Sequence, residues 1–131
     1  MIEEKMRNNI ENEPSIPKIL VIDDDESIIE VIELIMKASF LCNSNIKIIK
    51  CCNLEEAKKA VDKYKPDILF FDHYLNGNVG FDLLEYAKSK EVKQFYSTTG
   101  DDFLATQYEQ MGINKVKKIF IAQEIKKILA S

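Results

Sequence analysis

The chain has 131 residues, of which 46% are apolar and 31% charged, a composition typical of one globular domain. Its net charge of −4 argues against non-specific binding to nucleic acid. No apolar run approaches the roughly 18 residues that a membrane span requires, and residues 1–13 contain no hydrophobic signal core. We therefore expect a cytoplasmic protein that contacts neither a membrane nor nucleic acid directly.

From Lys18 onward, apolar runs of strand length alternate with stretches of helical periodicity. We expect strands at residues 19–22, 46–51, 68–71, 94–97 and 116–120. We expect helices at residues 27–40, 53–64, 81–88, 102–111 and 123–130. The first helix should bury one apolar face, made of Ile28, Ile32, Ile35 and Met36. A capping box at residues 53–56 should open the second helix.

This alternation predicts an α/β fold: a doubly wound, five-stranded parallel sheet with helices on both faces. The flavodoxin-like strand order 2-1-3-4-5 is the natural choice at this size. Residues 1–16 are polar and are expected to form an N-terminal extension, with one domain at residues 17–131.

The chain has three cysteines, Cys42, Cys51 and Cys52. The number is odd and no CxxC spacing is present, which disfavours a disulfide framework or a metal site. We expect reduced thiols that fill space in the core.

Carboxylates follow two of the expected strands directly. The first strand is followed by Asp23, Asp24 and Asp25, and the third strand by Asp72. The carboxyl ends of parallel strands form the ligand crevice of an open α/β sheet. Acids crowded there repel one another, and a hard divalent cation with oxygen ligands relieves that repulsion. The alternative for the first group is a solvated turn at a helix N-terminus, where acids are also favoured.

The other two strands that can reach this crevice supply hydroxyl and amine groups. Thr98 and Thr99 precede Gly100, and Lys117 and Lys118 lie on the fifth expected strand. Acids, a hydroxyl and an amine are the groups needed to transfer a phosphoryl group to a carboxylate. Taken alone, however, such threonines are ordinary strand residues and such lysines are more often surface charges.

In these motifs the chain resembles the receiver domain of two-component response regulators. The matching segments are Ile-Leu-Val-Ile-Asp-Asp-Asp at 19–25, Pro-Asp-Ile-Leu-Phe-Phe-Asp-x-x-Leu-x-Gly-x-x-Gly at 66–80, and Ser-Thr-Thr-Gly at 97–100. The resemblance extends over about residues 18–129. Each segment alone is a weak signal, but their order and spacing together are specific.

The resemblance implies that Asp72 accepts a phosphoryl group from a phosphohistidine on a histidine kinase or phosphotransfer protein. Magnesium would be held by Asp23, acting mainly through a water, and by Asp24, Asp72 and the backbone carbonyl of Tyr74. Thr99 would hydrogen-bond the phosphoryl group, and Lys118 would pair with one of its oxygens. Asp101 and Tyr74 occupy positions that tune the access of water in this family.

Phosphorylation would then change protein contacts on the surface formed by residues 102–111, 116–120 and 123–130. The protein would not be an enzyme with a separate substrate, although it would take part in its own phosphorylation and dephosphorylation. A homodimer is left open by the sequence.

The fifth strand departs from the family pattern. The usual Lys-Pro-Phe reads Lys118-Ile119-Phe120, and the segment that follows Gly112 is about two residues short, so Lys117 competes for the role of Lys118. We expect Lys118 to face the crevice, because neighbouring side chains on a strand alternate and Phe120 sets the register. Val116 stands where the family usually has an aromatic switch residue.

Two alternatives remain open. The first is a receiver-like docking module that no longer depends on phosphorylation. The second is a magnesium-dependent phosphohydrolase, but such enzymes commonly carry a second acid where this chain has Tyr74. His73, the single histidine, should point away from Asp72 and have no direct role.

Overall fold

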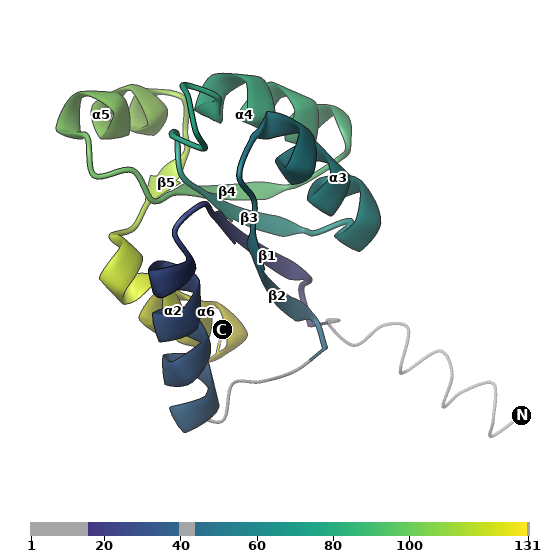
Figure 1. The fold of residues 1–131 in the computed structure, drawn as a ribbon, viewed down its shortest axis with the longest axis vertical. Coiled ribbons are helices and arrows are strands. Elements are labelled where there is room, and N and C mark those ends of the chain that lie inside the picture. Colours follow the sequence, from purple (N-terminus) through teal and green to yellow (C-terminus); the bar gives the residue numbers. More distant parts are fainter. Residues whose placement is uncertain (1–15, 40–43, 131) are drawn as a thin grey trace, which may run out of the picture.

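The computed structural model describes residues 16–39 and 44–130, which form a central sheet between two layers of helices (Figure 1). The strands are β1 (Ile19–Asp23), β2 (Ile46–Lys50), β3 (Ile68–Phe71), β4 (Gln94–Ser97) and β5 (Asn114–Lys115). The helices are α2 (Glu26–Ala38), α3 (Leu54–Tyr64), α4 (Gly80–Ser89), α5 (Asp102–Gln110), α6 (Ile121–Ala130) and the 3-10 helix η1 (Lys118–Phe120). No helix in the described ranges has the length and apolar character that a membrane span requires. Nearly all of the predicted N-terminal extension, the predicted end of the first helix at residue 40, and Cys42 lie outside those ranges.

The sheet has the strand order β2-β1-β3-β4-β5, and all its pairings are parallel, which confirms the predicted topology. Ile22 pairs with Phe71 of β3, and Phe71 pairs in turn with Ser97 of β4. The residues after these three positions therefore leave the sheet side by side at its carboxyl edge. This register is what brings distant parts of the sequence together.

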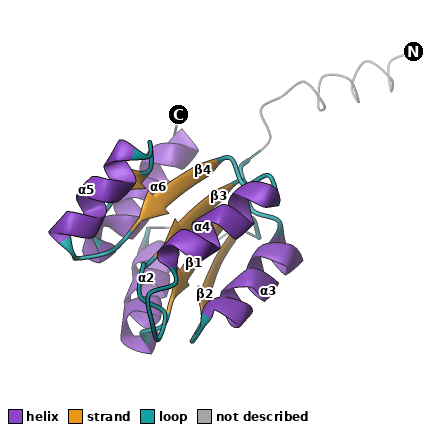
Figure 2. Cartoon of the chain, turned by 90° about the horizontal axis from the view of Figure 1, so that it is seen from above, coloured by secondary structure: helices purple, strands orange, loops and turns teal. Residues whose placement is uncertain are grey.

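Both faces of the sheet are buried, and each has its own core. Leu69 and Phe71 pack with α3, α4 and α5, whereas Ile68 and Phe70 pack with α2 and α6. Figure 1 shows the two groups of helices on opposite sides of the sheet, and Figure 2 shows the helices around the strands from above. Strands covered on both faces need apolar residues at every position, and this requirement explains the unbroken apolar runs of β1 and β3.

Side-chain caps set the starts of three helices. Asp25 accepts a hydrogen bond from the Ser27 amide at the start of α2, and Asp101 accepts one from the Leu104 amide at the start of α5. Asn53 accepts one from the Glu56 amide at 2.9 Å, so the predicted capping position of α3 is confirmed. Each cap satisfies an amide that the helix itself leaves unpaired.

Two predictions about burial are wrong. Ile35 is 38% exposed, and Ile29 is buried in its place, because the sheet-facing stripe of α2 passes through Ile29, Ile32 and Met36. Cys52 is exposed, whereas Cys51 is buried beneath α3. The two cysteines are neighbours in the extended segment that leaves β2, so only one of them can face the core.

The predicted fifth strand at 116–120 is also wrong. β5 covers Asn114–Lys115, the Val116 amide still donates to Ser97, and η1 follows. β5 lies at the edge of the sheet and has β4 as its one neighbour, so little ladder pairing is lost when the chain turns away. The turn is stabilised by a hydrogen bond from the Phe120 amide to Lys117 and by the ion pairs of Lys118 described below.

Candidate functional site

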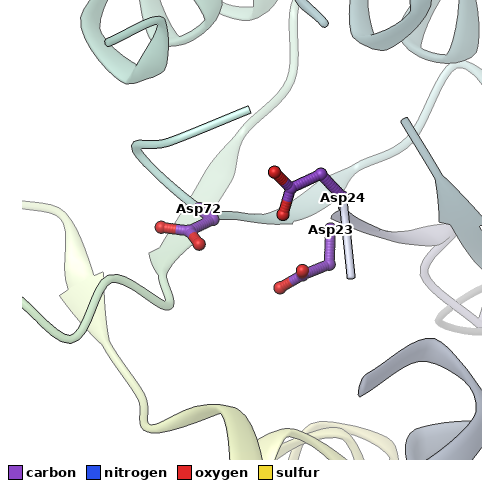
Figure 3. A group of neighbouring side chains, drawn as sticks. All are labelled: Asp23, Asp24 and Asp72. Carbon is purple, nitrogen blue, oxygen red and sulfur yellow. The ribbon is translucent and has the colours of Figure 1, made fainter. Parts of the chain in front are cut away.

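Asp23 and Asp72 lie next to each other because β1 and β3 are adjacent and end in register. Asp23 is 1% exposed and Asp72 is 7% exposed, so both carboxyl groups are largely removed from water. Figure 3 shows them with Asp24 at the carboxyl ends of the two strands. The acids that the sequence placed at strand ends are thus brought together by the fold.

One ammonium group bridges the two buried acids. Lys118 Nζ lies 2.8 Å from Asp72 Oδ2 and 3.0 Å from Asp23 Oδ2. Lys117, by contrast, is exposed and forms the cap position of η1. The structure therefore places Lys118, as predicted, against the carboxylates. Lys118 reaches them from the 3-10 helix η1, however, and not from a regular strand in which side chains alternate.

The charges of this triad influence one another. Burial raises the pKa of Asp23, and the hydrogen bond from the Asp25 amide and the contact with Lys118 oppose that rise. Burial alone lowers the pKa of Lys118, but its hydrogen bonds to Asp72 and Asp23 outweigh burial and raise that pKa above the ordinary value. At neutral pH the lysine is therefore charged and offsets part of the negative charge.

Asp24 completes a group of three carboxylates. One oxygen from each of Asp23, Asp24 and Asp72 lies within 4.8 Å of the other two. Hard oxygen donors at this separation suit Mg²⁺ or Ca²⁺, which take carboxylate and carbonyl oxygens. Asp25, the fourth acid of the sequence motif, is used as the cap of α2 and is not part of this group.

The loop after Asp72 is held by its own backbone. Asp72 Oδ1 accepts a hydrogen bond from the Tyr74 amide at 3.3 Å, and the His73 carbonyl accepts hydrogen bonds from the amides of Val79 and Gly80 at 3.0 Å each. The Tyr74 side chain is 42% exposed beside this loop. The predicted turn at 76–80 includes Asn76 and Gly77, both with positive φ. The loop is therefore compact around the acid that it carries.

Thr99 lies at the same edge of the sheet, just after β4. The preceding residue, Thr98, donates its amide to the Phe71 carbonyl at 2.9 Å, which fixes this segment beside β3. Thr98 is buried, whereas Thr99 is half-buried and its hydroxyl accepts a hydrogen bond from the Asp101 amide at 3.3 Å. Thr99 is thus the more exposed of the two threonines at this edge of the sheet.

One buried polar contact was missed by the sequence analysis. His73 Nδ1 lies 2.7 Å from the hydroxyl of Tyr108 in α5. The sequence predicted no direct role for His73, but the structure gives it a buried partner in α5. The available signal was the position of Tyr108 four residues after Leu104, on the buried face of α5.

Comparisons with known proteins agree with this fold. The family model described as Response regulator receiver domain matches residues 19–130. Regulatory protein VanR of Enterococcus faecium is 29% identical over 85 residues, which are 65% of this chain and 35% of VanR. Sensory transduction protein LytT of Bacillus subtilis (strain 168) is 25% identical over 114 residues, 86% of this chain and 46% of LytT.

Solved structures show the same fold. A response regulator from Chloroflexus aurantiacus J-10-fl superposes with a TM-score of 0.64 at 26% identity, over 88% of this chain and 100% of that chain. This chain spans less than half the length of each of the two curated relatives. Both relatives therefore contain regions that have no counterpart in this chain.

Proposed function

The chain belongs to the response regulator receiver family, and from this membership we propose that Asp72 accepts a phosphoryl group from a phosphohistidine. The donor is a histidine kinase or a phosphotransfer protein. The observation that carries the proposal is the position of Asp72, which is buried at the end of β3, paired with Lys118, and grouped with Asp23 and Asp24. The reaction is placed in the cytoplasm, a reducing compartment in which free thiols such as Cys51 and Cys52 persist.

The proposed step is a displacement at phosphorus. A carboxylate oxygen of Asp72 attacks, a phosphorus–oxygen bond forms, and the phosphorus–nitrogen bond of the phosphohistidine breaks. The electron pair of the broken bond stays on the imidazole nitrogen, which then takes a proton from solvent. The products are an acyl phosphate and a neutral histidine.

Lys118 and Thr99 stabilise the transferred group in this proposal. Lys118 already lies at Asp72 Oδ2, so its amine can pair with a phosphoryl oxygen after a small movement. The Thr99 hydroxyl can donate to another oxygen, because its present hydrogen bond uses it as an acceptor.

The three carboxylates fit Mg²⁺. In this proposal the backbone carbonyl of Tyr74 would be a further ligand. When bound, Mg²⁺ supplies the positive charge that neutralises the phosphoryl oxygens. Asp23, Asp24 and Asp72 would hold the ion, and the burial of Asp23 and Asp72 would strengthen their interaction with it.

The output of the reaction is a change in protein contacts at the surface made by α5, β5 and α6. Glu109 and Lys115 form an ion pair at 2.9 Å across the first two of these elements, so a shift of α5 changes the charge pattern of this surface. The chain accepts a phosphoryl group and has no separate substrate, so it acts as a switch and not as an enzyme.

The test uses phosphoramidate, whose phosphorus–nitrogen bond resembles that of phosphohistidine, and intact-protein mass measurement. With Mg²⁺, the wild type should gain one phosphoryl mass and Asp72→Asn should gain none. Asp82→Asn, which removes an exposed carboxylate in the first turn of α4, is the matched control and should be labelled like the wild type.

Labelling that persists in Asp72→Asn would overturn the assignment of the acceptor. A wild type that takes no label would favour the docking module that does not depend on phosphorylation.

A further inference from the structure

A buried polar pair connects the loop after Asp72 to helix α5. His73 Nδ1 and the Tyr108 hydroxyl are 2.7 Å apart, and the two residues are 4% and 0% exposed. His73 follows Asp72 directly in the chain, whereas Tyr108 lies in the last turn of α5. The hydrogen bond therefore joins the proposed acceptor to an element of the proposed output surface.

Close packing fixes the geometry of this pair. A Cβ atom at Gly80 would meet both the Tyr108 hydroxyl and His73 Nδ1, so the absence of a side chain there makes room for the hydrogen bond. The ring of Phe81 lies 5.0 Å from the His73 ring and 4.9 Å from the Tyr108 ring. Phe71 meets Tyr108 edge-on at 5.5 Å. The pair cannot shift without moving these neighbours.

The protonation states of the pair follow from burial. His73 and Tyr108 are both buried, and burial favours the uncharged imidazole and the uncharged phenol. A buried hydroxyl needs an acceptor, and Nδ1 is the acceptor recorded for Tyr108 in the described part of the chain. We therefore assign the hydroxyl as the donor to Nδ1, which puts the ring proton on Nε2.

Both ends of the pair are tied to the backbone that has to move. The His73 carbonyl accepts hydrogen bonds from the amides of Val79 and Gly80. These bonds close the loop between β3 and α4, residues 72–79, which we call the acceptor loop. The Tyr108 carbonyl accepts the amides of Met111 and Ile113, which lead directly into β5. Asp72 precedes His73 directly in the chain, and His73 contacts Tyr108 at 2.7 Å, so the carboxylate lies close to both members of the pair.

We propose that the His73–Tyr108 hydrogen bond couples the charge of Asp72 to the position of α5 and β5. Val116, which the family resemblance sets near the usual place of an aromatic switch, has no polar group that could hydrogen-bond with Thr99. A change of charge at Asp72 alters the field at the pair, and the pair holds the end of α5. The physiological signal for this coupling rests on the proposed phosphorylation, but the coupling itself can be measured without it.

The experiment is a double-mutant cycle read by amide NMR of the full chain. Asp72→Asn removes the charge, and Tyr108→Phe removes the hydroxyl while keeping the ring. In the wild type, Asp72→Asn should shift the amides of residues 102–115. In the Tyr108→Phe background, Asp72→Asn should shift these amides by less than about half of the wild-type amount. Tyr86→Phe is the control, because it removes an α4 hydroxyl that donates a hydrogen bond to Asp62 of α3. It should leave the shifts caused by Asp72→Asn unchanged.

A spectroscopic readout separates coupling from simple packing. The side-chain nitrogens of His73 should report a proton on Nε2 in the wild type, and the Nδ1 resonance should move in Tyr108→Phe and in Asp72→Asn. If Tyr108→Phe does not fold, His73→Phe/Tyr108→Phe replaces both polar partners with rings and provides the same comparison.

Equal shifts of residues 102–115 with and without the Tyr108 hydroxyl would overturn the coupling. Failure of phosphoramidate to label the wild type would instead overturn the proposed function, and the charge-removal cycle would still decide the coupling.

Discussion

Lys118 and Asp72 form an ion pair at 2.8 Å, and the same amine lies 3.0 Å from Asp23. A single flexible side chain, 27% exposed, thus offsets the charge of two buried carboxylates. A metal cation bound by these acids would interact with the same two carboxylates that Lys118 contacts. This shared position makes the stability of the site sensitive to each of its members.

Replacing Lys118 with alanine should destabilise the metal-free protein. The substitution leaves two neighbouring buried carboxylates without a cation, and we expect a loss of about 1–3 kcal/mol in the free energy of unfolding. Urea denaturation at pH 7 measures this loss. Lys117→Ala removes an exposed lysine one position earlier and should stay within about 0.5 kcal/mol of the wild type. Comparable losses in the two variants would show that the ion pairs of Lys118 contribute little.

Magnesium should stabilise the protein through the carboxylates. A ligand that binds the folded state at ten times its dissociation constant adds about 1.4 kcal/mol to the free energy of unfolding. We expect calorimetric melting of the wild type to move upward with added Mg²⁺, and Asp24→Asn to lose most of this response. The same variant relieves like-charge repulsion and should be at least as stable as the wild type without metal. A wild-type melting temperature that ignores Mg²⁺ would contradict the site.

The raised pKa of Asp23 predicts a pH dependence with a definite sign. Between its ordinary value of 3.8 and the higher folded-state value, the folded protein binds more protons than the unfolded chain. The contribution of Asp23 to stability therefore increases as the pH falls through the folded-state pKa and decreases as the pH rises through it. The free energy of unfolding of the wild type relative to Asp23→Asn should thus increase from pH 7 toward pH 4.

Asp82→Asn is the control for this pH series, because it removes an exposed carboxylate on α4. A gap between the wild type and Asp23→Asn that is flat, or that narrows toward pH 4, would show that burial does not control Asp23.

The neighbouring thiols should differ sharply in reactivity. Cys51 is 1% exposed and burial raises its pKa to about 12, whereas Cys52 is exposed. Because the thiolate is the reactive form, iodoacetamide at pH 8 should modify Cys52 in the folded protein and Cys51 only after denaturation. Tryptic digestion and fragmentation of the peptide at residues 51–58 identify the modified sulfur. Equal modification of the two thiols under native conditions would contradict the burial of Cys51.

The sequence predicted the sheet and the acids well for one physical reason. Strands buried on both faces, such as β1 and β3, have unbroken apolar runs, and the polar residue that ends each run marks the carboxyl edge. Asp23 and Asp72 were therefore found from local pattern alone. The family resemblance implied that Lys118 pairs with a phosphoryl oxygen, and its contacts with Asp23 and Asp72 come from the structure.

The fifth strand was less predictable because it lies at the edge of the sheet. The segment at 116–120 has strand-like residues, but tertiary ion pairs at Lys118 and a 3-10 turn override that local preference. The helical spacing of Tyr108 indicated its burial, but the sequence did not indicate its contact with His73. The partners of this contact are 35 residues apart, and a buried tyrosine on a helix usually indicates ordinary core packing.

Gly80 provides the sharpest test of how closely the acceptor loop packs against α5. An alanine Cβ at this position would collide with the Tyr108 hydroxyl and with His73, whose Cα would lie 2.8 Å away. Because that Cα belongs to the backbone and cannot rotate aside, Gly80→Ala should lower the free energy of unfolding by about 1–3 kcal/mol. Urea denaturation measures this loss of stability. We also expect the hydrogen bond between His73 and Tyr108 to be longer in this variant.

Gly100→Ala is the matched control, because a Cβ at Gly100 meets nothing within 4 Å and the residue has no positive φ. We expect its free energy of unfolding to lie within about 0.5 kcal/mol of the wild type. If Gly80→Ala were as well tolerated as Gly100→Ala, the loop would have room to move away from α5. The close contact between His73 and Tyr108 would then not be a fixed feature of the fold.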